Sequence, residues 1–153
     1  MANTYSQLYV QIVFAVKHRQ NFIREPFREE LQQYISGIIT AKKQKLYAIY
    51  CMPDHTHLLV SMKPDLAVSD LVRDIKANSS WFIKEQGHVN NRFSWQEGFG
   101  AFSYSKSQAD AVVQYILHQP QHHQKKTFRT EYLEFMAKFG VDYDDRYLFE
   151  FYD

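Results

Sequence analysis

The first part of the chain alternates between apolar and mixed positions. Every even position from Leu8 to Val16 is apolar, whereas the odd positions include Tyr9 and Gln11. A period of two predicts a β-strand, because successive side chains of a strand point to opposite faces of its sheet. Three later extended runs predict further strands, over residues 45–52, 55–62 and 101–105.

Two stripes of apolar residues at three- and four-residue spacing predict amphipathic helices. The first follows Pro26, a residue suited to a first helical turn, and includes Ile35. The second begins near Val68 and is expected to stop near Gly87. Residues 87–100 are then expected to form a loop.

The last third of the chain predicts two more helices. Ser107 and Asp110 resemble a capping box, and the helix that they open is expected to end sharply at Pro120. A final amphipathic stretch over residues 128–139 ends at Gly140.

The order strand, helix, strand, strand, helix, strand is that of the ferredoxin-like split β-α-β fold. We therefore expect an α+β protein with an antiparallel sheet, helices packed on one face, and additional C-terminal helices. The length of 153 residues suits one domain spanning residues 1–153. This fold hosts many unrelated activities, so function must be argued from the site.

Composition narrows the choice only slightly. The 18 Lys and Arg residues nearly balance the 17 Asp and Glu residues, so a nucleic-acid partner must be met by a local patch. The single cysteine, Cys51, cannot form an internal disulfide, which fits a reducing cytosol or simply gives no evidence for export. Its side chain is expected to be buried and to have no functional role. No signal peptide and no apolar run of about 20 residues is evident, which predicts a cytoplasmic protein without a membrane partner.

A His-x-His motif opens the third predicted strand. Strand geometry sends His55 and His57 to one face, close enough to share a metal ion, while Thr56 turns to the other. We expect the pair to be displayed on the face opposite the core. The alternative is two ordinary half-buried strand histidines.

A second pair of polar side chains lies on the late helix. Tyr115 and Gln119 are four residues apart and therefore share a helix face. A phenol can act as a covalent nucleophile, and an amide oxygen can complete a metal coordination shell. The alternative is a packing tyrosine and a capping or solvated glutamine.

Together these motifs resemble the IS200/IS605-like family of single-strand transposases, which belong to the HUH group of endonucleases. The resemblance covers nearly the whole chain. Its motifs are Pro53-Asp54-His55-Thr56-His57, Tyr115-Ile-Leu-His-Gln119, and His122-His123 before the helix start Thr127-Phe128.

The resemblance implies a chemistry for each motif. His55, His57 and Gln119 would bind a divalent ion, Mg²⁺ or Mn²⁺, and Tyr115 would attack DNA to leave a 5′-phosphotyrosine and a free 3′-hydroxyl. The partners implied are single-stranded DNA hairpins at transposon ends and a second copy of the chain. In such a homodimer the tyrosine helix of one subunit can complete the site of the other. The setting implied is the cytoplasm of a bacterial or archaeal cell, with nucleoid-associated DNA as substrate.

Basic side chains near the later helices are candidates for phosphate contacts, although a solvated helix face explains each of them as well. These candidates are Lys63, Arg73, Lys76, Lys84, Arg92, Lys125, Lys126 and Arg129. Trp81, Trp95 and Phe99 could stack on extruded bases, with core packing expected for at least one tryptophan.

Three other functions compete with this interpretation. A histidine-triad nucleotide hydrolase would need a third alternating histidine, but position 59 is Leu59. A domesticated hairpin-DNA-binding module, or a REP-type nuclease relative without transposition, would keep the fold. A purely structural role requires His55, His57, Tyr115 and Gln119 to coincide by chance.

Overall fold

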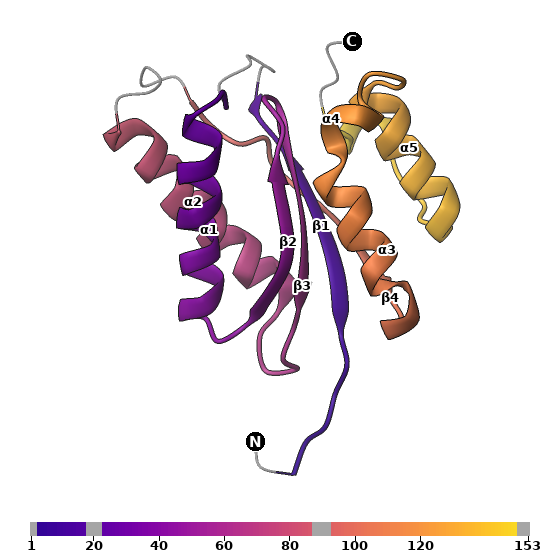
Figure 1. Ribbon diagram of the computed structural model, residues 1–153. Coiled ribbons are helices and arrows are strands. Elements are labelled where there is room, and N and C mark those ends of the chain that lie inside the picture. The colour runs from indigo at the N-terminus through magenta and orange to yellow at the C-terminus, as the bar shows by residue number, and fades with distance from the viewer. Residues whose placement is uncertain (1–2, 18–22, 87–92, 150–153) are drawn as a thin grey trace.

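A computed structural model describes residues 3–17, 23–86 and 93–149 of the chain. It is an α+β structure with one four-stranded sheet and helices on both of its faces (Figure 1). The strands are β1 Tyr9–Ala15, β2 Lys45–Cys51, β3 His55–Ser61 and β4 Gly100–Tyr104. The helices are α1 Phe27–Ala41, α2 Val68–Glu85, α3 Lys106–Leu117, α4 Gln119–His122 and α5 Phe128–Phe139, followed by a 3₁₀ turn at Asp145–Tyr147.

The sheet has the strand order β2-β3-β1-β4, and all of its pairs are antiparallel. This order, with α1 between β1 and β2 and α2 between β3 and β4, confirms the predicted ferredoxin-like arrangement. β3 is an inner strand, and its first residues pair with the end of β1: Ala15 faces His55 and Val13 faces His57. His55 and His57 therefore lie at one end of an inner strand of the sheet.

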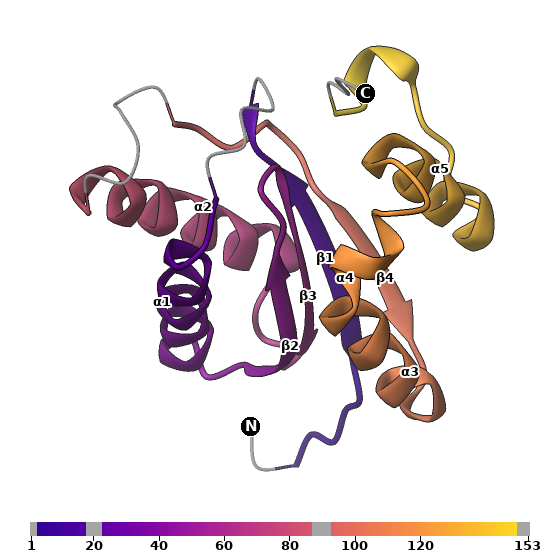
Figure 2. The same cartoon turned by 45° about the horizontal axis from the view of Figure 1, so that its top comes forward.

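Helices cover both faces of the sheet. α1 and α2 lie on one side and α3 to α5 on the other, as Figure 2 shows from a second angle. The even positions of β1 turn toward α2, where Lys76 lies over the ring of Phe14. The odd positions are buried as well: Gln11 and Val13 are both inaccessible to solvent. The alternation along β1 therefore separates two covered faces.

The α3 cap differs from the sequence prediction. Ser105 is the N-cap residue, and it forms the capping box with Gln108 in place of the predicted pair Ser107 and Asp110. The predicted pair was wrong because the strand β4 ends at Tyr104, which leaves Ser105 as the first residue able to cap the free N–H groups.

The end of this helix also differs from the prediction. α3 ends at Leu117, and the chain re-enters a single helical turn, α4, with Pro120 in its first turn. Because a proline is tolerated in the first turn of a helix, the chain bends at His118 and continues in helical form. The bend still leaves Gln119 directed at the same site as Tyr115.

α5 matches the predicted range. Thr127 caps it by accepting a hydrogen bond from Thr130 N, and Gly140 ends it in the left-handed conformation with a φ of 62°. The helix docks on β4 through Tyr132, which lies so close to Gly100 that a Cβ there would meet the phenol oxygen at 2.7 Å. A side chain at this position would push α5 off the sheet.

Cys51 and the two tryptophans differ in burial. Cys51 is fully buried, as expected. Trp95 is a core residue whose indole N–H donates to Ser79 Oγ, whereas Trp81 is 59% exposed on α2. Among the helices of the described residues, none combines the length and the apolar character that crossing a bilayer requires.

Candidate metal centre and nucleophile

His55 and His57 begin β3 and point to the face covered by the C-terminal helices. Their ring centroids are 5.2 Å apart. Phe128 of α5 stacks on the ring of His55 at 4.0 Å, and both histidines are buried. The prediction that they share a face is confirmed by this geometry, but the expectation that they are displayed there was wrong, because α4 and α5 cover them.

Two further side chains complete the cluster. His123 follows α4 and Glu131 lies in α5. One potential ligand atom from each of His55, His57, His123 and Glu131 lies within 4.8 Å of all the others. Glu131 Oε1 is 2.9 Å from His57 Nε2, 3.1 Å from His123 Nε2 and 3.7 Å from His55 Nε2. The carboxylate is therefore the centre of a ring of imidazole nitrogens.

Gln119 closes the cluster from the side of α4. Its Oε1 lies 3.3 Å from His55 Nε2 and 3.0 Å from His123 Nε2, and its Nε2 donates to Glu131 Oε2 at 2.9 Å. The side chain is fully buried. The structure thus brings together all three residues for which metal binding was predicted.

The other nitrogen of each clustered histidine is also engaged. His55 Nδ1 lies 2.7 Å from Asp54 Oδ1, and His123 Nδ1 lies 3.1 Å from the carbonyl oxygen of Lys126. His57 Nδ1 lies 3.0 Å from Gln11 Nε2. Contacts of this kind hold imidazole rings in one orientation and are typical of metal-binding histidines. All three Nε2 atoms are consequently directed at the same point.

Gln11 links two parts of the site. Besides its contact with His57, it accepts a hydrogen bond from the Tyr104 hydroxyl at 2.8 Å. An amide can present either its oxygen or its nitrogen to each neighbour, so the same position can accept from a protonated Nδ1. With that orientation, the Nε2 lone pair of His57 is available to a metal ion.

Tyr115 reaches the cluster from α3. Its hydroxyl donates a hydrogen bond to Glu131 Oε2, the oxygen that also accepts from Gln119. Its half-buried ring stacks on His122 with centroids 4.4 Å apart. The predicted nucleophile and the predicted ligands therefore meet at one carboxylate.

The charges in the cluster are strongly coupled. Burial alone would raise the pKa of Glu131, but the charges and hydrogen bonds of His57 and His123 outweigh burial and hold that pKa well below its usual range. Burial lowers the pKa of His57 despite Glu131. His123 is also partly desolvated, yet its hydrogen bond to Glu131 gives it a raised pKa. A carboxylate anion thus sits among imidazoles at neutral pH.

Tyr115 is held in its neutral form by the same environment. Burial raises the pKa of its phenol, and the charge of Glu131 and the hydrogen bond to it raise that pKa further. The phenol is therefore protonated at neutral pH, and any attack by its oxygen requires loss of that proton.

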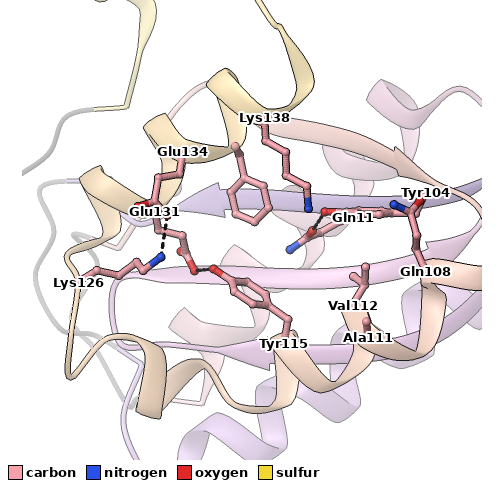
Figure 3. A pocket seen from close by; sticks show the side chains of 11 residues that line it. Gln11, Tyr104, Gln108, Ala111, Val112, Tyr115, Lys126, Glu131, Glu134 and Lys138 are labelled. Atoms are coloured by element: carbon pink, nitrogen blue, oxygen red, sulfur yellow. Dashed lines mark hydrogen bonds and ion pairs between the residues drawn. The ribbon is translucent and has the colours of Figure 1, made fainter.

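Two cavities reach the cluster from different sides. One, of about 340 Å³, lies between α3 and α5 and is lined by Tyr115 and Glu131 (Figure 3). The other, of about 450 Å³, is lined by His55, His123 and Lys125. Lys126 borders both cavities. A ligand can therefore approach the ring of donors from either side.

The predicted phosphate contacts are scattered. Lys76 donates to the carbonyl oxygens of Gln96 and Gly98, and Arg73 pairs with Asp70, so both have partners within the chain. Lys126 pairs with Glu134 beside the cluster. The side chains of Lys63, Lys84, Lys125 and Arg129 are exposed, and Arg92 lies outside the described residues. The site's nearest exposed cations are those that follow α4.

Sequence reasoning missed Glu131, His123 and Gln11 as members of the site. The sequence places the pair His122-His123 in a motif but assigns it no role. Glu131 carried a usable signal, because it lies on the apolar stripe of its helix, three residues after Phe128 and four before Phe135. A carboxylate on a buried stripe requires a partner.

The fold and the site together place a tyrosine hydroxyl from a late helix beside a buried cluster of histidines and a carboxylate on a ferredoxin-like sheet. Residues 4–119 match the family described as "Transposase IS200 like". The chain belongs to this family, and its activity class is that of a transposase, an enzyme that cleaves and transfers DNA.

Individual relatives agree with this assignment. The transposase for insertion sequence element IS200 of Salmonella typhimurium is 27% identical over 124 residues, covering 78% of this chain and 81% of the relative. The ISDra2 transposase TnpA of Deinococcus radiodurans is 28% identical over 74 residues, covering 48% of this chain and 53% of the relative.

Solved structures share the fold. A candidate transposase from Deinococcus radiodurans superposes with a TM-score of 0.61 at 22% identity, covering 76% of this chain and 94% of the other. A REP-associated tyrosine transposase bound to a REP hairpin gives a TM-score of 0.59 at 18% identity, covering 79% and 72%. The family match ends at residue 119, so His123 and Glu131 lie beyond it.

Proposed function

We propose that this transposase cleaves single-stranded DNA beside hairpins at transposon ends, using Tyr115 as the nucleophile and a divalent ion held by the histidine cluster. One observation carries the proposal: the Tyr115 hydroxyl is hydrogen-bonded to the carboxylate of Glu131, on which three imidazoles converge. A tyrosine that only packs in the core, or a pair of ordinary strand histidines, would not need to share a carboxylate.

The donor set fits a metal ion. Three imidazole nitrogens, the Gln119 oxygen and a carboxylate are suitable ligands for a divalent cation, and the contacts to Asp54 and Gln11 orient two of the rings. The ligands proposed are His55, His57 and Gln119, joined by His123 and Glu131. When bound, Mg²⁺ or Mn²⁺ would polarise a phosphate oxygen and offset the charge that develops during displacement.

The residues of the chain supply position and a nucleophile. The Tyr115 oxygen forms a bond to phosphorus as the bond from phosphorus to the 3′ oxygen breaks, while the phenol loses a proton and the 3′ oxygen gains one. Stacking on His122 and the hydrogen bond to Glu131 hold the phenol in place before attack. Because one phosphoester replaces another, a second 3′-hydroxyl can reverse the step without ATP.

The DNA partner is proposed to be a hairpin with a single-stranded flank. In support, one structure with the same fold is described as bound to a REP hairpin. A homodimer with exchanged tyrosine helices remains a prediction. Within one chain Tyr115 already contacts Glu131, so the site is also complete without such an exchange. Light scattering of the active protein tests whether two copies associate.

The decisive experiment detects the covalent intermediate. The protein is incubated with single-stranded hairpin DNA from the flanks of its own gene, with Mn²⁺ or with EDTA, and a denaturation-resistant protein–DNA band is sought. We expect the band to require both metal and Tyr115, and to be lost in Tyr115→Phe. The matched control is Tyr147→Phe, since Tyr147 is 80% exposed and far from the cluster in sequence.

A second candidate function is favoured by the same structural likeness. The chain could bind hairpin DNA, or nick it as a REP-type nuclease, without transposition; in support, one structure with the same fold is described as bound to a REP hairpin. Binding by wild type with no adduct would support the binding module, whereas an adduct without transfer to a second 3′-hydroxyl would support the nuclease.

A further inference from the structure

The cavity between α3 and α5 opens beside the nucleophile. Its volume of about 340 Å³ is within the roughly 300–1,000 Å³ typical of ligand pockets. Tyr115 and Glu131 form one end, and Tyr104 and Gln11 lie toward the other (Figure 3). It is therefore a built pocket that begins where a scissile phosphate would have to lie.

The walls of the cavity combine apolar and polar groups. Val112, Ala111 and the ring of Phe135 supply apolar surface. Gln108 accepts a hydrogen bond from Ser105 N through its Oε1, which leaves its amide hydrogens as donors beside the cavity. Phe135 is stacked on Phe102 and is 8% exposed, so it contributes to an apolar wall that a base can contact, while the nearby amide can contact the edge of that base.

Two ammonium groups border the same cavity, and they differ in their partners. Lys126 is paired with Glu134 at 2.7 Å. Lys138 lies on the α5 face of Glu131, seven residues further along, and its Nζ is 5.7 Å from the centre of the Tyr104 ring. Across the described part of the chain, no carboxylate pairs with Lys138. The Lys138 cation is thus available to a phosphate.

We propose that this cavity, the α3–α5 pocket, holds the nucleotide adjoining the scissile phosphate, with its base against Phe135 and its own phosphate near Lys138. The inference rests on the proposed function, because it takes Tyr115 as the attacking residue. Attack requires the phosphorus within about 3–3.5 Å of the phenol oxygen. The next nucleotide of the strand must then occupy space directly beside Tyr115, and this pocket provides it.

The pocket would thus make the chain itself a reader of the cleavage site. Hydrogen bonds from Gln108 to a base edge would add sequence preference, and Lys138 would add affinity that is independent of sequence. These roles differ from nonspecific electrostatic attraction of DNA, because in this pocket Lys138 acts on the phosphate of one nucleotide only.

The test compares DNA substrates and protein variants in one cycle. Hairpin substrates carry a single abasic site on the 5′ or the 3′ side of the cleavage position, and adduct formation is measured as KM and maximal rate. For wild type, an abasic site on one of the two sides should raise KM roughly tenfold or more, since the contacts of one base with a protein contribute on the order of 1–3 kcal/mol. Equal KM values for both abasic substrates and the intact DNA would overturn the proposal.

The variants locate the effect in the pocket. Ala111→Trp fills it, because Ala111 lines the cavity and is exposed there. This variant should raise KM for intact DNA and respond no further to the abasic site. Lys138→Met should raise KM roughly fivefold with little change in maximal rate, whereas the control Lys106→Met, the same change at the start of α3, should stay within twofold. Full discrimination of the abasic substrate by Ala111→Trp would place the base elsewhere.

The two proposals fail in different ways. If wild type forms no adduct with any hairpin, the proposed function fails before the pocket is tested. If wild type forms the adduct through Tyr115 but neither abasic substrate is impaired, the proposed function stands and the pocket assignment falls. Thermal unfolding of Ala111→Trp and Lys138→Met confirms that both variants are folded.

Discussion

Replacing Glu131 with glutamine tests the centre of the site. The wild-type carboxylate accepts hydrogen bonds from Gln119 and Tyr115 on one oxygen and contacts His57 and His123 on the other. Glutamine keeps the shape of the side chain but removes the charge and replaces one carboxylate oxygen with an amide N–H donor. That donor would face groups that already donate, so the buried network loses both charge and complementarity.

The expected loss is large. Removing one partner of a buried charged pair costs about 3–5 kcal/mol. For a chain of this size each kcal/mol corresponds to about 2–4 °C, so the unfolding temperature without metal should fall by roughly 6–20 °C. Because the pKa of Glu131 in the folded state lies below its usual 4.5, this stabilisation is complete at pH 7 and is lost as the pH falls below 4.5.

Thermal unfolding followed by circular dichroism at pH 7 in EDTA measures this loss. Glu134→Gln is the matched control, since Glu134 lies one turn further along α5 and forms only an exposed pair with Lys126. It should cost at most about 1 kcal/mol. If both variants unfold within 2 °C of wild type, the carboxylate does not organise the cluster and the reasoning is refuted.

The same samples report on metal binding. Mn²⁺ at about 100 times its Kd should stabilise wild type by about 2.7 kcal/mol. Glu131→Gln should show a smaller gain at the same concentration, whereas Glu134→Gln should match wild type. An undiminished gain in Glu131→Gln would remove Glu131 from the proposed ligands.

Three other residues give independent predictions. Because the pKa of His123 is raised above 6.5, its contribution to stability is complete below pH 6.5 and is lost as the pH rises through the raised value. The difference in unfolding free energy between wild type and His123→Gln, measured without metal, should therefore shrink as the pH rises. A difference that stays constant would contradict the ion pair with Glu131. Gln11→Leu should weaken Mn²⁺ binding about 10–100-fold in calorimetry, because it removes the contact that orients His57, and unchanged affinity would show that the contact has no such role. Burial raises the pKa of Cys51 to about 12, so the thiol should not react with a disulfide reagent at pH 8 until denaturant is added, and fast labelling of the native protein would mean that β2 opens.

Much of the fold could be predicted from local pattern. The helical stripe that ends at Gly140 and the His-x-His strand carry their own signals, because helix ends and strand faces depend on neighbouring residues. The burial of both sheet faces could not be predicted in this way. Gln11 reads as a solvent-facing strand residue, and only the docking of α5 through Tyr132 on Gly100 shows that its face is covered.

The candidate site divides along the same line. Gln119 and Tyr115 could be found because their spacing on one helix face is local, and His55 and His57 because of strand alternation. Glu131 is brought to them by tertiary packing alone. The phosphate contacts could be predicted least well, since charge in sequence does not say whether an ammonium faces solvent or, like that of Lys76, the carbonyl oxygens of a neighbouring loop.

Glu131 contacts both the proposed metal ligands and the proposed nucleophile. Variants at different residues should therefore affect metal binding and DNA cleavage separately. Tyr115→Phe removes the attacking oxygen but none of the proposed ligands, so metal affinity should survive while the adduct is lost. His57→Ala removes a proposed ligand and should lower both. Lys138 lies over the ring of Tyr104 and is neither a proposed metal ligand nor the proposed nucleophile, so Lys138→Met should leave metal affinity unchanged and act only through the DNA. The three patterns differ in which measurement changes, and that difference follows from the position of Glu131 between β3, α3 and α5.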